Sequence, residues 1–295
     1  MRKEQFLSHP ETKKFVQYFA AALDGSRRID FRHSGGSDAR ISDALFRYAW
    51  PHRRATIHAP TGDRDLPAWS GLEANNLILQ ELSSGIRRAL TRRIVQHTEL
   101  NDWSRAILQW GGVLTGRGNG RWLESMSRRR GLADYFRRAT NALKRDDELG
   151  ISALRDLRSN AGMTKVYSLL LDDFVIYDSR VAAALAWLVY RWAQHERVDV
   201  PEHLRFVCMK GRTTKTRMKL RSPDKEVFPF VVASGPVENH VRHARWNLRA
   251  NWIIQAAINH RGRSISVWDS RKVEAALFMM GEDLSLAVNQ ESIRC

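Results

Sequence analysis

The amino-acid sequence predicts a mainly α-helical globule. Apolar residues make up 43% of its 295 residues, which is enough to bury a sizeable core. In several segments these residues recur at helical spacing, and proline, at 8 residues, is scarce. The length allows one large domain or two small ones, but no long Gly/Ser linker or fixed-period repeat divides the chain. We therefore expect a single α-dominated unit over residues 1–295.

The first expected helix covers residues 11–23, where apolar residues have helical spacing. Residues 26–70 are expected to be irregular, with one short helix near 41–49, because glycine and proline interrupt them repeatedly. From 72 to 97, leucine and isoleucine again recur at the spacing of a helix, although Gly85 interrupts the pattern.

Most of the remaining chain also has helical character. Helices are expected from the Asn101-Asp102 pair to Trp110, and over 121–145 and 150–159. A last helix is expected to end at Gly281.

One later segment has strand-like composition instead. The runs 204–208 and 227–232 are rich in β-formers, and a polar, basic loop separates them. They predict a small β-hairpin near 204–232. Pro236 then precedes an expected helix over 237–258.

The charge balance favours a polyanionic partner. Lysine and arginine number 48 against 32 acidic residues, which gives a formal charge of +16. Such an excess attracts nucleic acid above all, although a basic surface kept for solubility and an anionic membrane are alternatives. The longest apolar run, 181–190, is too short to cross a bilayer and predicts a buried core helix. With no signal-like stretch at the start, we expect a cytoplasmic protein.

Basic residues gather in one segment, 205–221, which contains seven cations and no acid. Small hydroxyl residues and glycine lie between the cations, a composition suited to phosphate contacts, whereas the alternative is a solvated loop. The residues expected to bind DNA here are Lys210, Arg212, Lys215, Arg217 and Lys219.

The most informative segment is the expected core at 150–192. Asn160, Ala161 and Gly162 form a tight turn, 163–171 a short helix and 174–177 an extended apolar run. Asp178 then lies at the N-cap of a buried helix, a structural role that would by itself explain an aspartate there.

The same local geometry also predicts chemistry. The start of the 163–171 helix can present backbone N–H groups to a phosphate, with Asn160, Gly162, Thr164 and Arg180 as DNA contacts. Lys165, one turn inside that helix, is expected near Asp178. A lysine amine beside a carboxylate in a partly dry cleft can act as a nucleophile or as an acid/base pair.

The stretch GMTKVYSLLLDDFVIYDSRV resembles the core of helix-hairpin-helix DNA glycosylases. The resemblance implies a mainly helical fold that binds the DNA backbone at the hairpin and flips a damaged or modified base into a pocket. It implies that Asp178 stabilises positive charge on the sugar or activates water, and that Lys165 matches the amine that forms a Schiff base in some members. The chain departs from the family at Asn160-Ala161-Gly162, where Gly-x-Gly is usual, and in the shorter separation of Lys165 from Asp178.

Two further segments resemble a subgroup of that family. FVIYDSRVAAALAWLV and the later VEAALFMMGEDL look like bacterial proteins of phage-defence loci. One such kind removes glucosylated hydroxymethylcytosine from phage DNA and leaves an abasic site. Aromatic residues near the glycine loops or the core segment are candidates for the base pocket, with a core role as the alternative for each. These candidates are Trp110, Trp122, Tyr167 and Tyr177.

The expected partner is double-stranded DNA with an extruded base, without a cofactor, a metal, a membrane or an obligate protein partner. Two alternatives remain open: a non-catalytic DNA- or RNA-binding protein in which Asp178 is only a cap, and a metal-dependent nuclease. The histidine pairs His52/His58 and His240/His243 lack suitable partners for a zinc enzyme. Asp172-Asp173 is expected to be a solvated turn.

Overall fold

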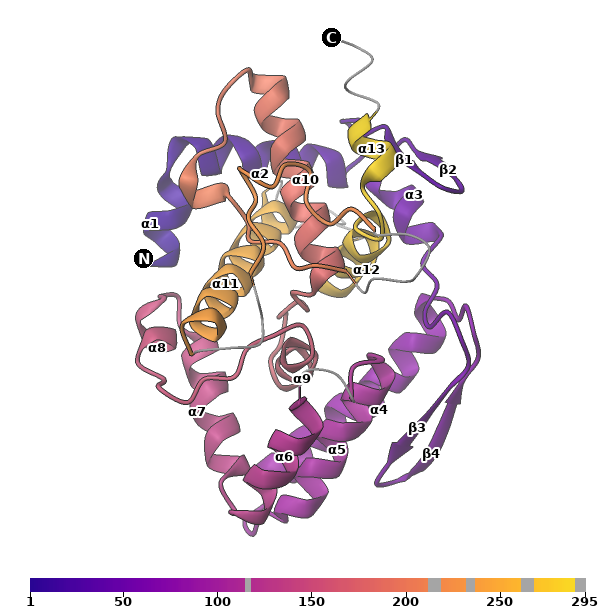
Figure 1. Cartoon of the computed structure of the whole chain (residues 1–295), viewed down its shortest axis with the longest axis vertical. Helices are drawn as coiled ribbons and strands as arrows, with labels where there is room; N and C mark the ends of the chain where they lie inside the picture. The colour runs from indigo at the N-terminus through magenta and orange to yellow at the C-terminus, as the bar shows by residue number, and fades with distance from the viewer. Residues whose placement is uncertain (115–117, 212–218, 232–236, 261–267, 290–295) are drawn as a thin grey trace.

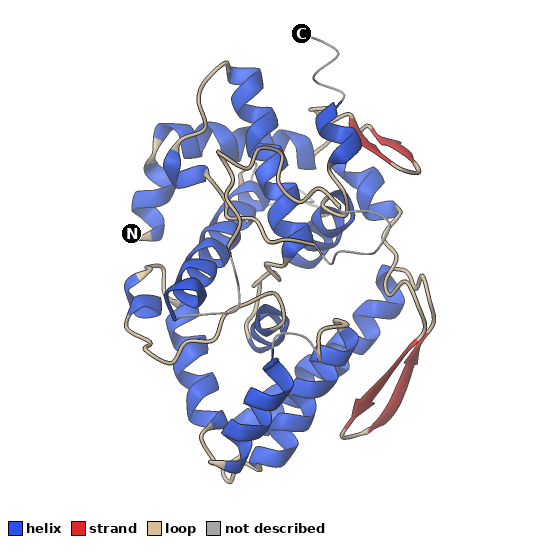
Figure 2. Cartoon of the chain, viewed as in Figure 1, coloured by secondary structure: helices blue, strands red, loops and turns tan. Residues whose placement is uncertain are grey.

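The computed structural model describes residues 1–114, 118–211, 219–231, 237–260 and 268–289. Within these ranges the chain forms thirteen α-helices and two small antiparallel sheets of two strands each. Figure 2 shows how far the helices outnumber the strands. The prediction of a mainly helical globule is therefore confirmed.

The elements follow one another along the chain with short connections. The helices are α1 (Lys3–Ser8), α2 (Pro10–Leu23), α3 (Ile41–Phe46), α4 (Leu72–Thr91), α5 (His97–Trp110), α6 (Asn119–Arg128), α7 (Leu132–Lys144), α8 (Leu149–Ser152), α9 (Met163–Leu170), α10 (Ser179–Glu196), α11 (Val237–Asn259), α12 (Ser270–Met280) and α13 (Ser285–Asn289). The strands are β1 (Phe31–His33), β2 (Gly36–Asp38), β3 (Ala55–Ala59) and β4 (Gly62–Leu66), and one 3-10 helix, η2, covers Glu202–Leu204.

The helices form two groups, one above the other in Figure 1. In the lower group α5 packs against α4, α6 and α7, and α9 lies against α4 and α5. In the upper group α10 packs against α2 and α12, while α12 also packs against α3. The segment 171–178 joins α9 to α10, so it carries the chain from one group to the other. Residues of α9 and the start of α10 consequently meet where the two groups face each other.

Helix α10 is buried over most of its length, as the apolar run 181–190 predicts. Residues from Val181 to Val189 are at most 1% exposed, so this helix lies inside the upper group. Its N-cap is Asp178, whose Oδ1 accepts hydrogen bonds from the backbone N–H groups of Arg180 (2.9 Å) and Val181 (3.1 Å). The predicted cap is confirmed.

The expectation that 26–70 is irregular apart from one short helix is wrong for four short strands. β1 pairs with β2 and β3 with β4 as two antiparallel hairpins, on either side of α3. Gly36 and Gly62, which suggest loops in the sequence, begin the second strand of each hairpin and both have positive φ. The short helix expected near 41–49 is α3, one turn shorter than predicted.

The predicted hairpin near 204–232 is also wrong for the residues that the structure describes. Cys208 forms one isolated β-bridge to Phe230, and the two segments run parallel there, whereas the strands of a hairpin are antiparallel. The backbone N–H of Cys208 donates to the carbonyl of Pro229, and the carbonyl of Cys208 accepts from the N–H of Val231. Pro229 has no N–H, so it cannot add a further hydrogen bond between the two segments. The strand-like composition reflects burial: Phe206, like Cys208, is fully buried.

Helix ends differ from the expectations where the backbone turns tightly. The segment predicted as one helix over 121–145 is split into α6 and α7, because Arg130 has positive φ and Gly131 caps α7. Only α8 forms within the segment expected to be helical over 150–159. In the described part of the chain, no helix combines the length and apolar character needed to cross a membrane.

Candidate functional site

A cavity of about 500 Å³ is lined by residues of both helix groups. Residues of α4, α5 and α9 line it from the lower group, and residues of α10 and α12 line it from the upper group. It is also lined by residues outside these helices, among them Tyr48, Trp50, His52, Met209, Lys210, Lys219 and Arg221. This volume falls in the range of about 300 to 1,000 Å³ that is typical of small-molecule sites.

Lys165 and Asp178 face each other at this cavity. Nζ of Lys165 lies 3.2 Å from Oδ2 of Asp178, and the two side chains are only 6% and 11% exposed. Lys165 comes from α9 and Asp178 from the N-cap of α10, so the segment between these helices folds back to bring them together. The structure thus places the two predicted catalytic residues in one site.

Gly111, at the end of α5, leaves room for the Lys165 side chain. A Cβ atom added at Gly111 would lie 2.3 Å from Cδ and 2.6 Å from Cε of Lys165, far inside van der Waals contact. Any larger residue at 111 would therefore push the lysine away from Asp178.

The surroundings of Asp178 favour its ionised form. Burial by itself raises the pKa of a carboxyl group. Here the Lys165 ammonium, the Val181 N–H and the charge of Arg180 outweigh burial and hold the pKa of Asp178 below its usual value of 3.8. The pair is therefore an ion pair near neutral pH, with a carboxylate available to the cavity.

Glu274 on α12 is a second buried carboxyl group in the same cavity, and the sequence reasoning did not single it out. Its Oε2 accepts from the backbone N–H of Ile176 (2.6 Å), and its Oε1 accepts from Arg271 (2.5 Å). Burial raises the pKa of Glu274, and the charge of Arg271 opposes this rise. The bond to Ile176 anchors the segment that leads into Asp178, so Glu274 positions that carboxylate.

Aromatic side chains form one wall of the cavity. The Arg180 guanidinium lies 4.2 Å from the ring centre of Phe278 and 5.8 Å from that of Trp50. Trp50 donates from Nε1 to the carbonyl of Trp110 (2.9 Å), and both tryptophans line the cavity. Trp50 and Phe278 were missed from the sequence, because nothing in their neighbourhood marks them as different from core residues.

Of the four aromatic residues predicted for a base pocket, only Trp110 lines this cavity. Tyr167 is buried and donates to the carbonyl of Arg158 (2.6 Å), while Tyr177 is buried and donates to the carbonyl of Val207 (2.7 Å). The ring of Trp122 packs edge-on against another tyrosine with 4.7 Å between centres. The core alternative describes Trp122, Tyr167 and Tyr177 better, because packing and hydrogen bonds already occupy them.

Cations exceed acids around the cavity. Arg180 contacts His52 (2.9 Å) and Glu282 (3.5 Å) through one terminal nitrogen, while its other terminal nitrogen is buried without a partner among the described residues. Lys219 pairs with Glu282 (2.6 Å), and burial lowers the pKa of Arg221 to about 10. These cations give the cavity an excess of positive charge suited to phosphate groups.

The outer part of the cavity includes one exposed predicted DNA contact, Lys210. Arg212, Lys215 and Arg217, also predicted to bind DNA, lie outside the described residues. Of the described cations in 205–221, Lys210, Lys219 and the buried Arg221 line the cavity, and phosphate binding by this segment stays a prediction.

The turn before α9 does not present free N–H groups. The side-chain oxygen of Asn160 accepts from the backbone N–H groups of Gly162 (2.9 Å) and Met163 (3.1 Å). The N–H of Thr164 donates to the Asn160 carbonyl (3.0 Å), and that of Lys165 to the Gly162 carbonyl (3.1 Å). Asn160 and Thr164 are at most 1% exposed, so they cannot touch a phosphate unless the turn opens. Of the three residues at this turn that are predicted to bind DNA, which are Asn160, Gly162 and Thr164, only Gly162 borders the cavity.

No known family model, curated protein or solved structure matches the chain. Its function is therefore argued from the geometry and chemistry of the cavity.

Proposed function

We propose that the protein is a DNA glycosylase that excises a modified base and leaves an abasic site. The observation that carries this proposal is the buried Lys165–Asp178 ion pair at the wall of a cavity with aromatic and cationic sides. The short-range resemblance of the 162–181 segment to helix-hairpin-helix glycosylases points in the same direction.

Asp178 is the group that acts on the sugar. The N-glycosidic bond breaks, the electron pair leaves with the base, and positive charge develops on the sugar, where the carboxylate stabilises it. A water oxygen then bonds to the sugar carbon, and its proton passes to Asp178. Since Oδ1 is held by the α10 cap and Oδ2 by Lys165, the carboxylate has a fixed orientation.

Lys165 acts in this scheme as a cation rather than as a nucleophile. An ammonium group paired with a carboxylate has no free electron pair, so it does not form a Schiff base while the pair is intact. Its charge keeps Asp178 ionised. The expected product is therefore an abasic site in an uncut strand.

The flipped base enters the aromatic side of the cavity, beside the Trp50 and Phe278 rings, which contact each other edge-on with 5.5 Å between centres, while cations at the cavity edge hold the DNA backbone. A volume of about 500 Å³ leaves room for a base that carries a further group. Glucosylated hydroxymethylcytosine of phage DNA, the substrate suggested by the resemblance, is therefore the first modified base to test.

The deciding experiment incubates the protein with duplexes that contain different modified bases, with and without chelator, and then adds alkali. Breaks that appear only after alkali and survive the chelator are expected. Direct breaks that vanish with the chelator would support a metal-dependent nuclease instead.

The second candidate function is non-catalytic binding of DNA or RNA. It is favoured by one observation: capping α10 is a sufficient structural reason for an aspartate at 178. Salt-sensitive binding without breaks on any duplex of the panel would select it.

A further inference from the structure

A second cleft, of about 1140 Å³, shares no lining residue with the cavity around Lys165. It lies among the α1–α2 corner, α8, η2 and α11. Among the described residues, one group of three side chains could hold a metal ion, and it consists of His9, Glu11 and His203. His9 and His203 line this cleft. We propose that these three residues bind a divalent transition metal of the zinc class.

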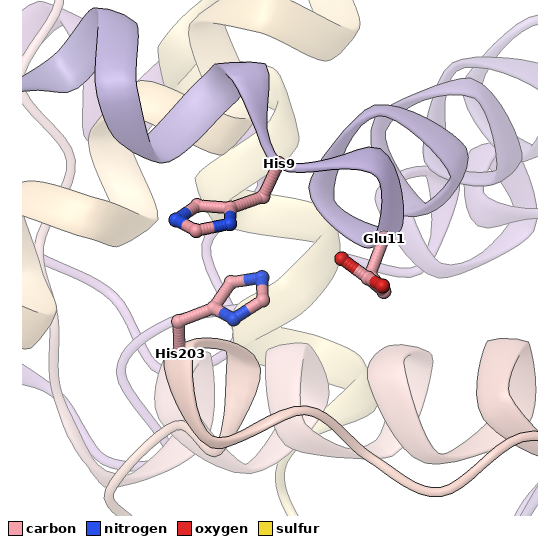
Figure 3. A group of neighbouring side chains, drawn as sticks. All are labelled: His9, Glu11 and His203. Carbon is pink, nitrogen blue, oxygen red and sulfur yellow. The ribbon is translucent and has the colours of Figure 1, made fainter.

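Segments far apart in the sequence supply the three ligands. His9 lies between α1 and α2, Glu11 lies in the first turn of α2, and His203 lies in η2. Figure 3 shows the two imidazole rings one above the other, with the Glu11 carboxylate beside them. The ring centres are 4.4 Å apart and the rings are 25° from parallel.

The spacing of the ligand atoms is close to what zinc requires. One ligand atom from each residue can be chosen so that all three lie within 4.8 Å of one another. In a tetrahedral site with bonds of about 2.1 Å, ligand atoms lie about 3.4 Å apart. The ligand atoms must therefore approach one another by up to about 1.4 Å, and the two rings must rotate out of their stacked arrangement, because the lone pair of each ring nitrogen lies in the plane of its ring.

An independent observation points to a ligand at His203. Nε2 of His203 is buried and has no hydrogen-bond partner among the described residues. A buried polar atom without a partner costs free energy, and a metal ion bound there would remove that cost.

The chemistry of the ligand set selects the metal. Two imidazoles and one carboxylate suit zinc, whereas magnesium and calcium prefer oxygen ligands alone. The nearby cation Arg249 is already paired with Glu148 (2.6 Å), which limits its repulsion of a metal. Three protein ligands leave a fourth position to water, on the side of the second cleft.

A metal ion here would join the α1–α2 corner to the segment that follows α10. Because such an ion binds the folded state only, it would stabilise the fold in proportion to its concentration and affinity. This role is independent of base excision, since none of the three ligands lines the first cavity.

The test uses the full chain without an affinity tag, stripped with chelator and then titrated with zinc chloride by calorimetry. One zinc ion per chain and a rise in Tm with zinc concentration are expected. Glu11→Gln and His203→Gln should each weaken binding by about tenfold or more. Cobalt chloride should give the visible absorption of a four- or five-coordinate site in the wild type but not in Glu11→Gln or His203→Gln.

The matched control is His58→Gln, which removes an exposed histidine that pairs with Asp63 but has no third ligand in the part of the chain that the structure describes. It should bind zinc like the wild type. Should His203→Gln fail to fold, Glu11→Gln, on a half-buried helix turn, still decides the question. The proposal is overturned if the wild type binds no zinc, or if Glu11→Gln binds it with unchanged affinity.

Discussion

The carboxylate of Asp178 is held from two sides: Oδ1 caps α10 through two backbone N–H groups, and Oδ2 lies 3.2 Å from the ammonium of Lys165. One interaction is local and the other joins two helices. The cap fixes where the carboxylate lies, and the lysine fixes its charge. A group that is both fixed and ionised is preorganised to stabilise a developing positive charge.

Asp178→Asn separates these two roles. Asparagine is also a good N-cap, so α10 should keep its start, but the negative charge is lost. We expect base excision to fall by roughly 100-fold or more, with DNA affinity nearly unchanged. Alkali-dependent strand breaks under single-turnover conditions measure the rate.

The control for that variant is Asp172→Asn, which removes an exposed carboxylate paired with Arg87. Its excision rate should equal that of the wild type. Full activity in Asp178→Asn would contradict the assignment of the reaction to this carboxylate.

Lys165→Met tests the ion pair through pH. Without the ammonium, the pKa of Asp178 rises, so the acidic limb of the excision rate should move to higher pH. In the wild type, borohydride should trap no covalent adduct with DNA. Trapping that disappears in Lys165→Met would instead identify this lysine as a nucleophile.

The same pair predicts how stability depends on pH. Because the folded-state pKa of Asp178 is below 3.8, its contribution to stability is present above that pH and is lost as pH falls through the folded value. Lys165→Met should lower the free energy of unfolding by about 3 kcal/mol near neutral pH, since it leaves the buried charge of Asp178 without its partner. Denaturant unfolding measures this free energy. Adding Asp178→Asn to Lys165→Met should restore part of the lost stability.

Gly111→Ala should disturb the site without removing any of its polar groups. The new methyl group would overlap Cδ of Lys165 and push its ammonium away from Asp178. We expect a lower excision rate and retained DNA binding. Gly71→Ala, where an added Cβ meets nothing within 4 Å, is the control, and equal rates in the two variants would refute the role of Gly111.

Lys210→Ala should weaken DNA binding at every sequence and reduce the salt dependence of binding by about one counterion. Lys219→Ala should change DNA affinity and its salt dependence less, because Glu282 already neutralises Lys219. Binding isotherms at several salt concentrations give the slopes. Arg54→Ala, which removes an exposed arginine paired with Asp65, should leave the slope unchanged.

The parts of the site that the sequence predicted are those controlled by neighbours in the chain. Asp178 follows an apolar run and precedes a buried helix, so its cap could be predicted from about ten residues. The sequence could not predict the roles of Glu274, Trp50 and Phe278. Each resembles an ordinary helix or loop residue in the sequence, and only the packing of distant elements brings it to the cavity. The prediction of a base pocket from Trp122, Tyr167 and Tyr177 rests on their closeness in sequence to the glycine loops or the core segment. Closeness in sequence does not reveal the direction of a side chain.

By itself, the sequence determined the helical class of the fold, its excess of positive charge and the start of α10. These depend on composition, periodicity and capping, which act over a few residues. Only the tertiary structure decided that glycines in 26–70 make hairpins, that the 204–232 segment packs without one, and that Lys165 reaches Asp178. Those outcomes depend on which distant surfaces bury each other, and burial is a property of the whole chain.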